Sequence, residues 1–191
     1  SAYRQIRENG LHPEDVYALA GAAGGPKWIV LQQFDKWMFG EWFSGRKEPL
    51  HLLGSSAGVW RFAAALAFDD PVEGLRRFKE AYFSQVYKGR PSPEEVSRLF
   101  GEATSDLIFP ESINHILNHS YGRLSIFISR ARGLMAQENL KLQGLGFLMA
   151  IAGNAISRDW LKFWFQRVVF QDSRTAVSLF DPREFDTQIV G

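Results

Sequence analysis

The chain has 191 residues, of which 46% are hydrophobic and 23% are charged. This length and composition suit one folded domain and exclude a disordered or fibrous chain. The 22 basic and 21 acidic side chains nearly balance, so the net charge gives no sign of a nucleic-acid partner. The absence of cysteine excludes disulfides and thiol-based catalytic or metal sites. The longest strongly apolar run, from Gly144 to Gly153, is about half as long as a membrane-spanning helix, and the polar first segment has no signal-peptide core.

The first part of the chain alternates between short strands and helices in the manner of an α/β protein. Residues 16–20 (VYALA) and 50–53 (LHLL) have the composition of strands. Each runs through a glycine-rich loop into a helical pattern, over residues 27–43 and 59–68 respectively. Two successive strand–loop–helix units predict parallel neighbouring strands whose loops share the carboxyl edge of the sheet.

The rest of the chain is predicted to be mostly helical. Three segments begin at prolines, which favour a first helical turn, and a long helix follows a third strand at residues 124–129 (LSIFIS). The expected helices are residues 71–86, 93–101, 110–119 and 133–170, the last with a break near Gly153–Asn154. A loop is expected at 88–93, and a fourth strand at 175–179 (TAVSL) followed by a polar tail. The predicted fold class is α/β, a three-layer sandwich with a mainly parallel central sheet and a helix-rich middle.

The motif Gly54-Ser55-Ser56-Ala57-Gly58 is a G-x-S-x-G sequence between a predicted strand and a predicted helix. Such a turn is typical of a nucleophile elbow, which holds a serine in a strained conformation with its hydroxyl exposed. Glycines on either side permit the close backbone approach that the turn needs. Ser56 is therefore the candidate nucleophile, and the amide of Ala57 at the helix start is a candidate oxyanion donor. The alternative is a turn in which serine merely caps the helix.

The loop GAAGGPK, from Gly21 to Lys27, fits neither common phosphate-binding pattern. Pro26 stands where a Walker loop and a dinucleotide fingerprint each need a glycine. The backbone amides of a small-residue loop beside an elbow suit an oxyanion instead. Gly24 and Gly25 are the expected donors, since Pro26 has no N–H group. A plain strand–helix crossover is the alternative.

Together, Gly24-Gly25-Pro26-Lys27 and the elbow thirty residues later resemble the patatin-like phospholipase family. That family carries a G-G-x-[RK] oxyanion loop, a G-x-S-x-G elbow and a later D-G-[GA] motif. The resemblance covers about the first 70 residues, and it departs from the family at Ala23 and Trp28, where glycines are usual. It implies a Ser–Asp dyad that hydrolyses acyl esters of lipids. It also implies that Lys27 helps to hold the oxyanion loop, although a surface lysine is the simpler reading.

The family's catalytic aspartate is missing from its expected motif, because the chain contains no Asp-Gly pair. The aspartates in the later part of the chain are Asp106, Asp159, Asp172, Asp181 and Asp186. Asp181 is the best of these as a dyad partner, but its Asp-Pro context is that of a surface turn. We therefore expect the base to lie beyond Gly191. The 191-residue chain alone would then be nearly inactive, since serine without a base is a weak nucleophile.

A Ser–His–Asp esterase is a further alternative, with Asp106 followed by His115 or His119 in the required chain order. These histidines are four residues apart and share a helix face, yet the segment lacks the glutamate of a zinc-binding H-E-x-x-H motif. A solvated or half-buried helix face explains them more simply.

Two aromatic-rich regions have both a structural and a lipid-related interpretation. Trp37, Phe39, Trp42 and Phe43 suit a core, although a lipid hydrolase would also place such side chains in an acyl pocket. The apolar run at 144–153, with DWLKFWFQRVVF downstream, suits either an acyl-binding or membrane-facing helical pair or a buried one.

We therefore expect residues 1–191 to form a single patatin-like α/β-hydrolase domain, incomplete at its C-terminus. The expected activity is that of a phospholipase A, lysophospholipase or lipase with Ser56 as nucleophile. Gly24, Gly25 and Ala57 would form the oxyanion hole, with Lys27, Gly54 and Gly58 in support. No metal or cofactor is expected; the partner is a lipid ester, with peripheral membrane contact by a cytoplasmic protein. The main alternative is a non-catalytic lipid-binding or interaction module that kept the elbow and lost the dyad.

Overall fold

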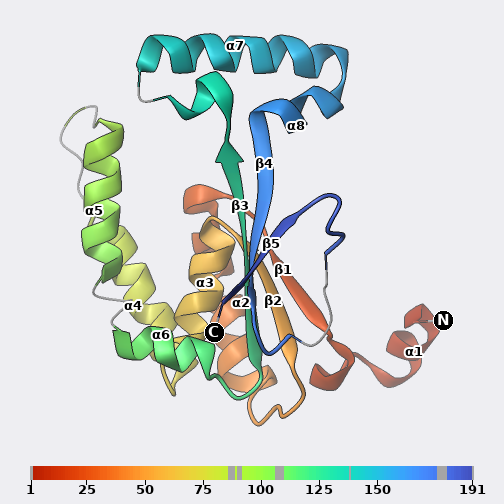
Figure 1. Ribbon diagram of the computed structural model, residues 1–191. Coiled ribbons are helices and arrows are strands. Elements are labelled where there is room, and N and C mark those ends of the chain that lie inside the picture. Colours follow the sequence, from red (N-terminus) through yellow and green to blue (C-terminus); the bar gives the residue numbers. More distant parts are fainter. Residues whose placement is uncertain are drawn as a thin grey trace. The chain divides into compact units, whose positions relative to one another are not determined.

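A computed structural model of the protein describes residues 2–85, 89, 92–105, 110–137, 139–175 and 180–190 (Figure 1). It is an α/β protein with a five-stranded, mostly parallel sheet in the order β1-β2-β3-β4-β5. The α/β class, the mainly parallel sheet and the helix-rich middle are thus confirmed. The chain forms two compact units, Ser1–Ser125 and Ile126–Val190. The expectation of one domain over residues 1–191 stays a prediction.

The first unit begins with two parallel strands, β1 (Ala18–Gly21) and β2 (Leu50–Ser55). Their register places Gly21 opposite Gly54, so both strands end at the same level. Leu50 and Leu52 of β2 are fully buried. The two predicted strands are confirmed, each displaced by no more than two residues.

Helices make up most of the remainder of the first unit. They are α1 (Ala2–Asn9), η1 (Pro13–Asp15), η2 (Gly25–Leu31), α2 (Gln32–Trp37), η3 (Met38–Trp42), α3 (Ala57–Leu66), α4 (Pro71–Phe83), α5 (Pro93–Ser105) and α6 (Pro110–Leu117). The helix predicted over residues 27–43 is continuous but changes from 3-10 through α to π geometry. The three helices predicted to start at prolines are confirmed, and the loop expected at 88–93 lies largely outside the described residues.

The core of the first unit forms where α3 packs against both strands and against α4. Phe39 and Phe43 are almost fully buried there, so the interpretation of the aromatic helix end as core is confirmed for these two. Trp37 from the same segment remains 43% exposed. Trp28 is also buried and stacks on Phe78 of α4, with 4.6 Å between ring centroids. Trp28, one of the two residues at which the loop departs from the expected pattern, therefore anchors η2 in the core.

A buried arginine ties together the segments that lead into the two strands. Arg46 donates hydrogen bonds to the carbonyl of Val16 at 2.9 Å and of Pro49 at 3.1 Å. It also donates to the carbonyls of Glu48, at 2.8 Å, and Pro13. One guanidinium thus satisfies four backbone oxygens, which a lysine ammonium with three donors on a flexible stem does not reproduce.

The second unit contains the elements in which the structure departs most from the sequence-based expectation. These are the end of β3 (Gly122–Ala131), η4 (Gly133–Ala136), α7 (Leu140–Ile156), η5 (Arg158–Trp160), α8 (Leu161–Trp164), β4 (Phe165–Asp172) and β5 (Asp186–Val190). β3 confirms the third predicted strand. The helix predicted over residues 133–170 is wrong beyond residue 164. It is interrupted after Ala136, where Gln137 is extended, and at Ser157 rather than near Gly153–Asn154.

β4 is a strand because its side chains are buried in a sheet. Val168 and Val169 are fully buried, and β4 pairs in parallel with β5. β-branched residues favour this extended setting over a helix. The polar tail predicted after residue 179 is likewise wrong, because residues 186–190 form β5. The strand expected at 175–179 lies, apart from Thr175, outside the described residues.

Candidate active site

Ser56 occupies a sharp turn between β2 and α3. Its φ of 51° and ψ of −124° make it the only non-glycine residue with positive φ among those that the structure describes. L-residues adopt this conformation only when the surroundings impose it, and such strain clusters at functional sites. The side chain is exposed. This is the backbone geometry of a nucleophile elbow.

Two glycines of the motif make the turn sterically possible. A Cβ atom on Gly58 would lie 2.1 Å from the carbonyl oxygen of Gly21, and one on Gly54 would lie 2.8 Å from the backbone nitrogen of Val59. Both distances are shorter than real Cβ contacts, and the opposing atoms are backbone. Packing therefore requires glycine at Gly54 and Gly58, since any side chain would push α3 away from β1 and β2. Their support of a catalytic serine stays a prediction.

The hydroxyl of Ser56 does not cap the helix. The Ser56 carbonyl accepts hydrogen bonds from the N–H groups of Val59 at 3.0 Å and Trp60 at 3.3 Å, but the side chain makes no capping bond. The interpretation of Ser56 as a simple N-cap is thus not supported. The first N–H groups of α3, including that of Ala57, have no partner within the helix and carry its positive dipole end.

The glycine-rich loop leaves β1 beside the elbow. Because Gly21 lies opposite Gly54 in adjacent parallel strands, both loops start from the same sheet edge. Gly25 has a φ of +51°, and a Cβ there would meet nothing within 4 Å, so backbone conformation rather than space requires glycine. Gly24 is exposed, and its carbonyl accepts the N–H group of Lys27 at 3.2 Å. The side chain of Lys27 is exposed too.

A buried ion pair joins the helices that follow the two loops. Asp35 of α2 is fully buried and Arg61 of α3 is 7% exposed. Nε of Arg61 donates to Asp35 at 2.6 Å, and Nη2 donates to the second carboxylate oxygen, so the contact is bidentate. The pair holds α3, and with it Ser56, in a defined place against α2. Sequence reasoning missed it, although Arg61, the single charge in the apolar helix α3, was the available signal.

The described aspartates of the second unit are engaged with neighbouring residues. Asp172 is bonded to Arg174, with a shortest distance of 2.6 Å, and Asp181 to Arg183 at 2.7 Å. The hydrogen bonds from Arg183 lower the pKa of Asp181, as expected for a surface turn. Asp159 forms an ion pair with Lys162. Asp186 accepts hydrogen bonds from the side chains of Gln166 and Gln188. Asp106, the remaining candidate, lies outside the described residues.

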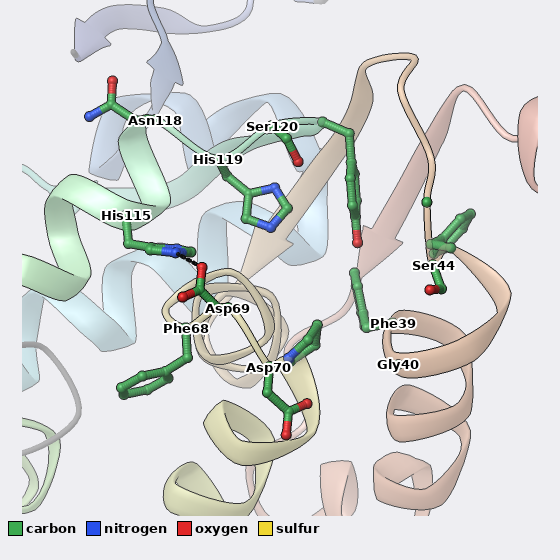
Figure 2. Close-up of a pocket in the computed structure, with 14 residues that line it drawn as sticks. Phe39, Gly40, Ser44, Phe68, Asp69, Asp70, His115, Asn118, His119 and Ser120 are labelled. Carbon is green, nitrogen blue, oxygen red and sulfur yellow. Dashed lines mark hydrogen bonds and ion pairs between the residues drawn. The ribbon is translucent and has the colours of Figure 1, made fainter.

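The two histidines lie at the opposite end of α3 from Ser56. Nδ1 of His115 lies 2.9 Å from the carbonyl oxygen of Leu66. Nε2 lies 3.0 Å from a carboxylate oxygen of Asp69 (Figure 2), and both ring nitrogens donate together only in the protonated imidazole. The Leu66 carbonyl, followed by Asp69, raises the pKa of His115. The rise of a 10-residue helix separates this point from Ser56 by about 15 Å. His115 is therefore out of hydrogen-bonding reach of Ser56.

A cavity of about 540 Å³ opens at this far end of α3. Figure 2 shows His119 beside His115 on its wall, with Asp69 and Asp70 beneath them. Nδ1 of His119 accepts a hydrogen bond from the N–H group of Gly122 at 3.0 Å, so the His119 ring is held against the first residue of β3. The cavity is thus separate from the elbow, and the structure does not bring either histidine to the candidate nucleophile.

Comparisons with protein-family models, curated proteins and solved structures find no match to this chain. The resemblance to patatin-like phospholipases thus depends on the two loops, which the structure places side by side. Of the helices within the described residues, none is both long and apolar enough to cross a membrane.

Proposed function

We propose that the protein is a serine acyl hydrolase of the patatin-like phospholipase class, with Ser56 as its nucleophile. The observation that carries this proposal is the strained backbone of Ser56 between a parallel strand and a helix, with its side chain exposed. Helix capping does not account for this strain, since the Ser56 hydroxyl does not cap α3. An exposed and strained serine at the carboxyl edge of an α/β sheet is a feature of catalysis.

In the proposed reaction the Ser56 Oγ attacks the carbonyl carbon of a lipid ester while a base removes its proton. The amides of Gly24, Gly25 and Ala57 stabilise the oxyanion, and the loss of one such donor costs roughly 2.7–4 kcal/mol of transition-state stabilisation. The intermediate collapses to an acyl-serine and releases the protonated alcohol. Water then cleaves the acyl-serine to a fatty acid and regenerates Ser56. The family resemblance assigns the base to the aspartate of a D-G-[GA] motif.

The substrate class follows from the resemblance of the GGPK loop and the GSSAG elbow to lipid hydrolases. We propose phospholipid or neutral lipid esters, hydrolysed without a metal or organic cofactor by a cytoplasmic protein in peripheral contact with membranes.

The test is the rate of labelling by an alkyl fluorophosphonate, followed on gels with a fluorescent probe. A form of the protein that carries the D-G-[GA] aspartate should be labelled, and Ser56→Ala in that form should abolish the signal. Ser55→Ala is the matched control, because Ser55 precedes the turn as the last residue of β2. Labelling that persists in Ser56→Ala, or that requires Ser55 instead, would reject the assignment.

A non-catalytic lipid-binding module is the second candidate. It is favoured by one observation: in the described part of the first unit, Asp35 is bound to Arg61, while Asp69 and Asp70 lie beyond the far end of α3. None of these three aspartates is placed to activate Ser56. Under this alternative neither the wild type nor Ser55→Ala is labelled, whereas lipid binding is retained.

A further inference from the structure

Helix α7 in the second unit packs through its smallest residues. Gly146, Ala150 and Gly153 form its buried seam. A Cβ on Gly146 would lie 2.8 Å from Met135 Cγ of η4, and one on Gly153 would lie 3.1 Å from Trp160 Cβ of η5. This side of α7 therefore packs against η4 and η5, and the other sides of the helix are exposed to solvent.

The large apolar side chains of α7 and α8 are on the exposed sides. Leu148 and Ile151 are each 66% exposed, and Phe163 is 74% exposed. We call the α7–α8 apolar surface the set Leu140, Leu142, Leu145, Phe147, Leu148, Met149, Ile151, Ile156, Trp160 and Phe163. Single exposed apolar residues are normal, but so many on two successive helices mark an interaction surface.

The charges around this surface are mainly positive. α7 contains no acidic residue, and Lys141 lies at its start. Arg158 follows its end, and neither cation forms an ion pair within the part of the chain that the structure describes. Lys162 forms an ion pair with Asp159 at 2.9 Å. Asp159 is the only acidic residue in the sequence from 140 to 164. An apolar face bordered by cations at both ends of a helix complements an anionic lipid surface.

We propose that the α7–α8 apolar surface docks the protein on anionic lipid bilayers. α7 lies along the plane of the interface with its leucine, isoleucine and phenylalanine side chains among the acyl chains, while Lys141 and Arg158 contact lipid phosphates. Trp160, exposed near the end of α7, suits the headgroup level, where its ring is partly apolar and partly polar. Where docking is taken to bring lipid substrate to Ser56, the inference rests on the proposed function. The docking itself is measured without catalysis.

The test is flotation of the protein with vesicles of ether-linked lipids, which have no ester to hydrolyse. Binding to vesicles that contain phosphatidylglycerol should exceed binding to pure phosphatidylcholine and should weaken with salt. Leu148→Ser with Ile151→Ser should lower the partition coefficient about a hundredfold, about tenfold for each side chain withdrawn from the bilayer. Tyr3→Ser is the matched control, since Tyr3 is 71% exposed on α1, and it should bind like the wild type.

A second variant separates charge from apolar burial. Lys141→Gln with Arg158→Gln should reduce binding to anionic vesicles by roughly fivefold per cation and leave the weak binding to neutral vesicles unchanged. The proposal is overturned if the wild type does not float, or if Leu148→Ser with Ile151→Ser floats equally well. It is also overturned if light scattering shows that the surface is instead covered by a second copy, as a dimer that these substitutions dissociate.

The two proposals fail separately. Flotation without fluorophosphonate labelling supports the docking surface and rejects the hydrolase. Labelling at Ser56 without flotation supports the hydrolase and rejects the docking surface.

Discussion

Replacing Gly58 by alanine perturbs the contact that the elbow makes with the end of β1. Gly58 is the second residue of α3, and its Cα faces the backbone of Gly21. A new Cβ would lie 2.1 Å from the carbonyl oxygen and 2.3 Å from the carbonyl carbon of Gly21. Real Cβ atoms essentially never approach closer than 3.0 Å, so α3 and β1 would have to separate.

Two opposing effects decide the magnitude. Alanine is favoured over glycine within a helix by about 1 kcal/mol. Overpacking typically costs about 1–3 kcal/mol, and we expect the upper end because backbone atoms oppose the new methyl group. The net prediction for Gly58→Ala is a loss of about 2 kcal/mol in the free energy of unfolding. For a chain of this size that corresponds to a fall in Tm of about 4–8 °C.

Urea and thermal unfolding followed by circular dichroism measure this change. Gly101→Ala is the matched control, because Gly101 also lies in a helix of the first unit, α5, but a Cβ there meets nothing within 4 Å. This control should be neutral or stabilising by up to about 1 kcal/mol. If Gly58→Ala were as stable as Gly101→Ala, the close contact between the elbow and β1 would be refuted.

Asp35→Asn or Arg61→Gln leaves one buried charge unpaired and should lower the free energy of unfolding in urea by about 3–5 kcal/mol, whereas Asp35→Leu with Arg61→Met should recover most of it. The carbonyl of Leu66 raises the pKa of His115 above its ordinary 6.5, so protonated His115 stabilises the folded state. This contribution to the free energy of unfolding is fully present below pH 6.5 and is lost as the pH rises through the pKa of His115 in the folded state. His115→Gln should remove this pH dependence from unfolding curves. Arg46→Lys leaves backbone carbonyls unpaired and should cost about 1–3 kcal/mol for each buried one, again measured in urea.

Each of these predictions has a result that contradicts it. Equal stability of the wild type and the Asp35→Asn variant would mean that the ion pair does not hold α3. If the free energy of unfolding of His115→Gln kept the pH dependence of the wild type, the contact between His115 and Leu66 would not be the cause of that dependence. A neutral Arg46→Lys would show that the four carbonyls are satisfied without the guanidinium.

The elbow was predictable because its signal is local. The G-x-S-x-G motif, the apolar strand before it and the apolar helix after it all lie within about twenty consecutive residues. The parallel pairing of β1 and β2 followed from the same repeat of strand, loop and helix.

The features that sequence reasoning missed depend on contacts between distant residues. Asp35 and Arg61 are 26 residues apart, and no local pattern pairs them. The strand β4 continues directly from the aromatic helix α8, and only the burial of Val168 beside β5 shows where the helix ends. In α7, apolar residues surround the helix, so the sequence alone did not tell the packed side from the exposed one.

The central claim, that Ser56 is a reactive nucleophile, is tested most directly by mapping a fluorophosphonate adduct to its residue. Trypsin should release residues 48–61 as one peptide, whose only hydroxyl side chains are those of Ser55 and Ser56. In a form of the protein that carries the D-G-[GA] aspartate, the account predicts a mass increase of one phosphonyl group on this peptide, with fragment ions that place it on Ser56. An adduct on Ser55, on any other peptide, or on none would contradict the account.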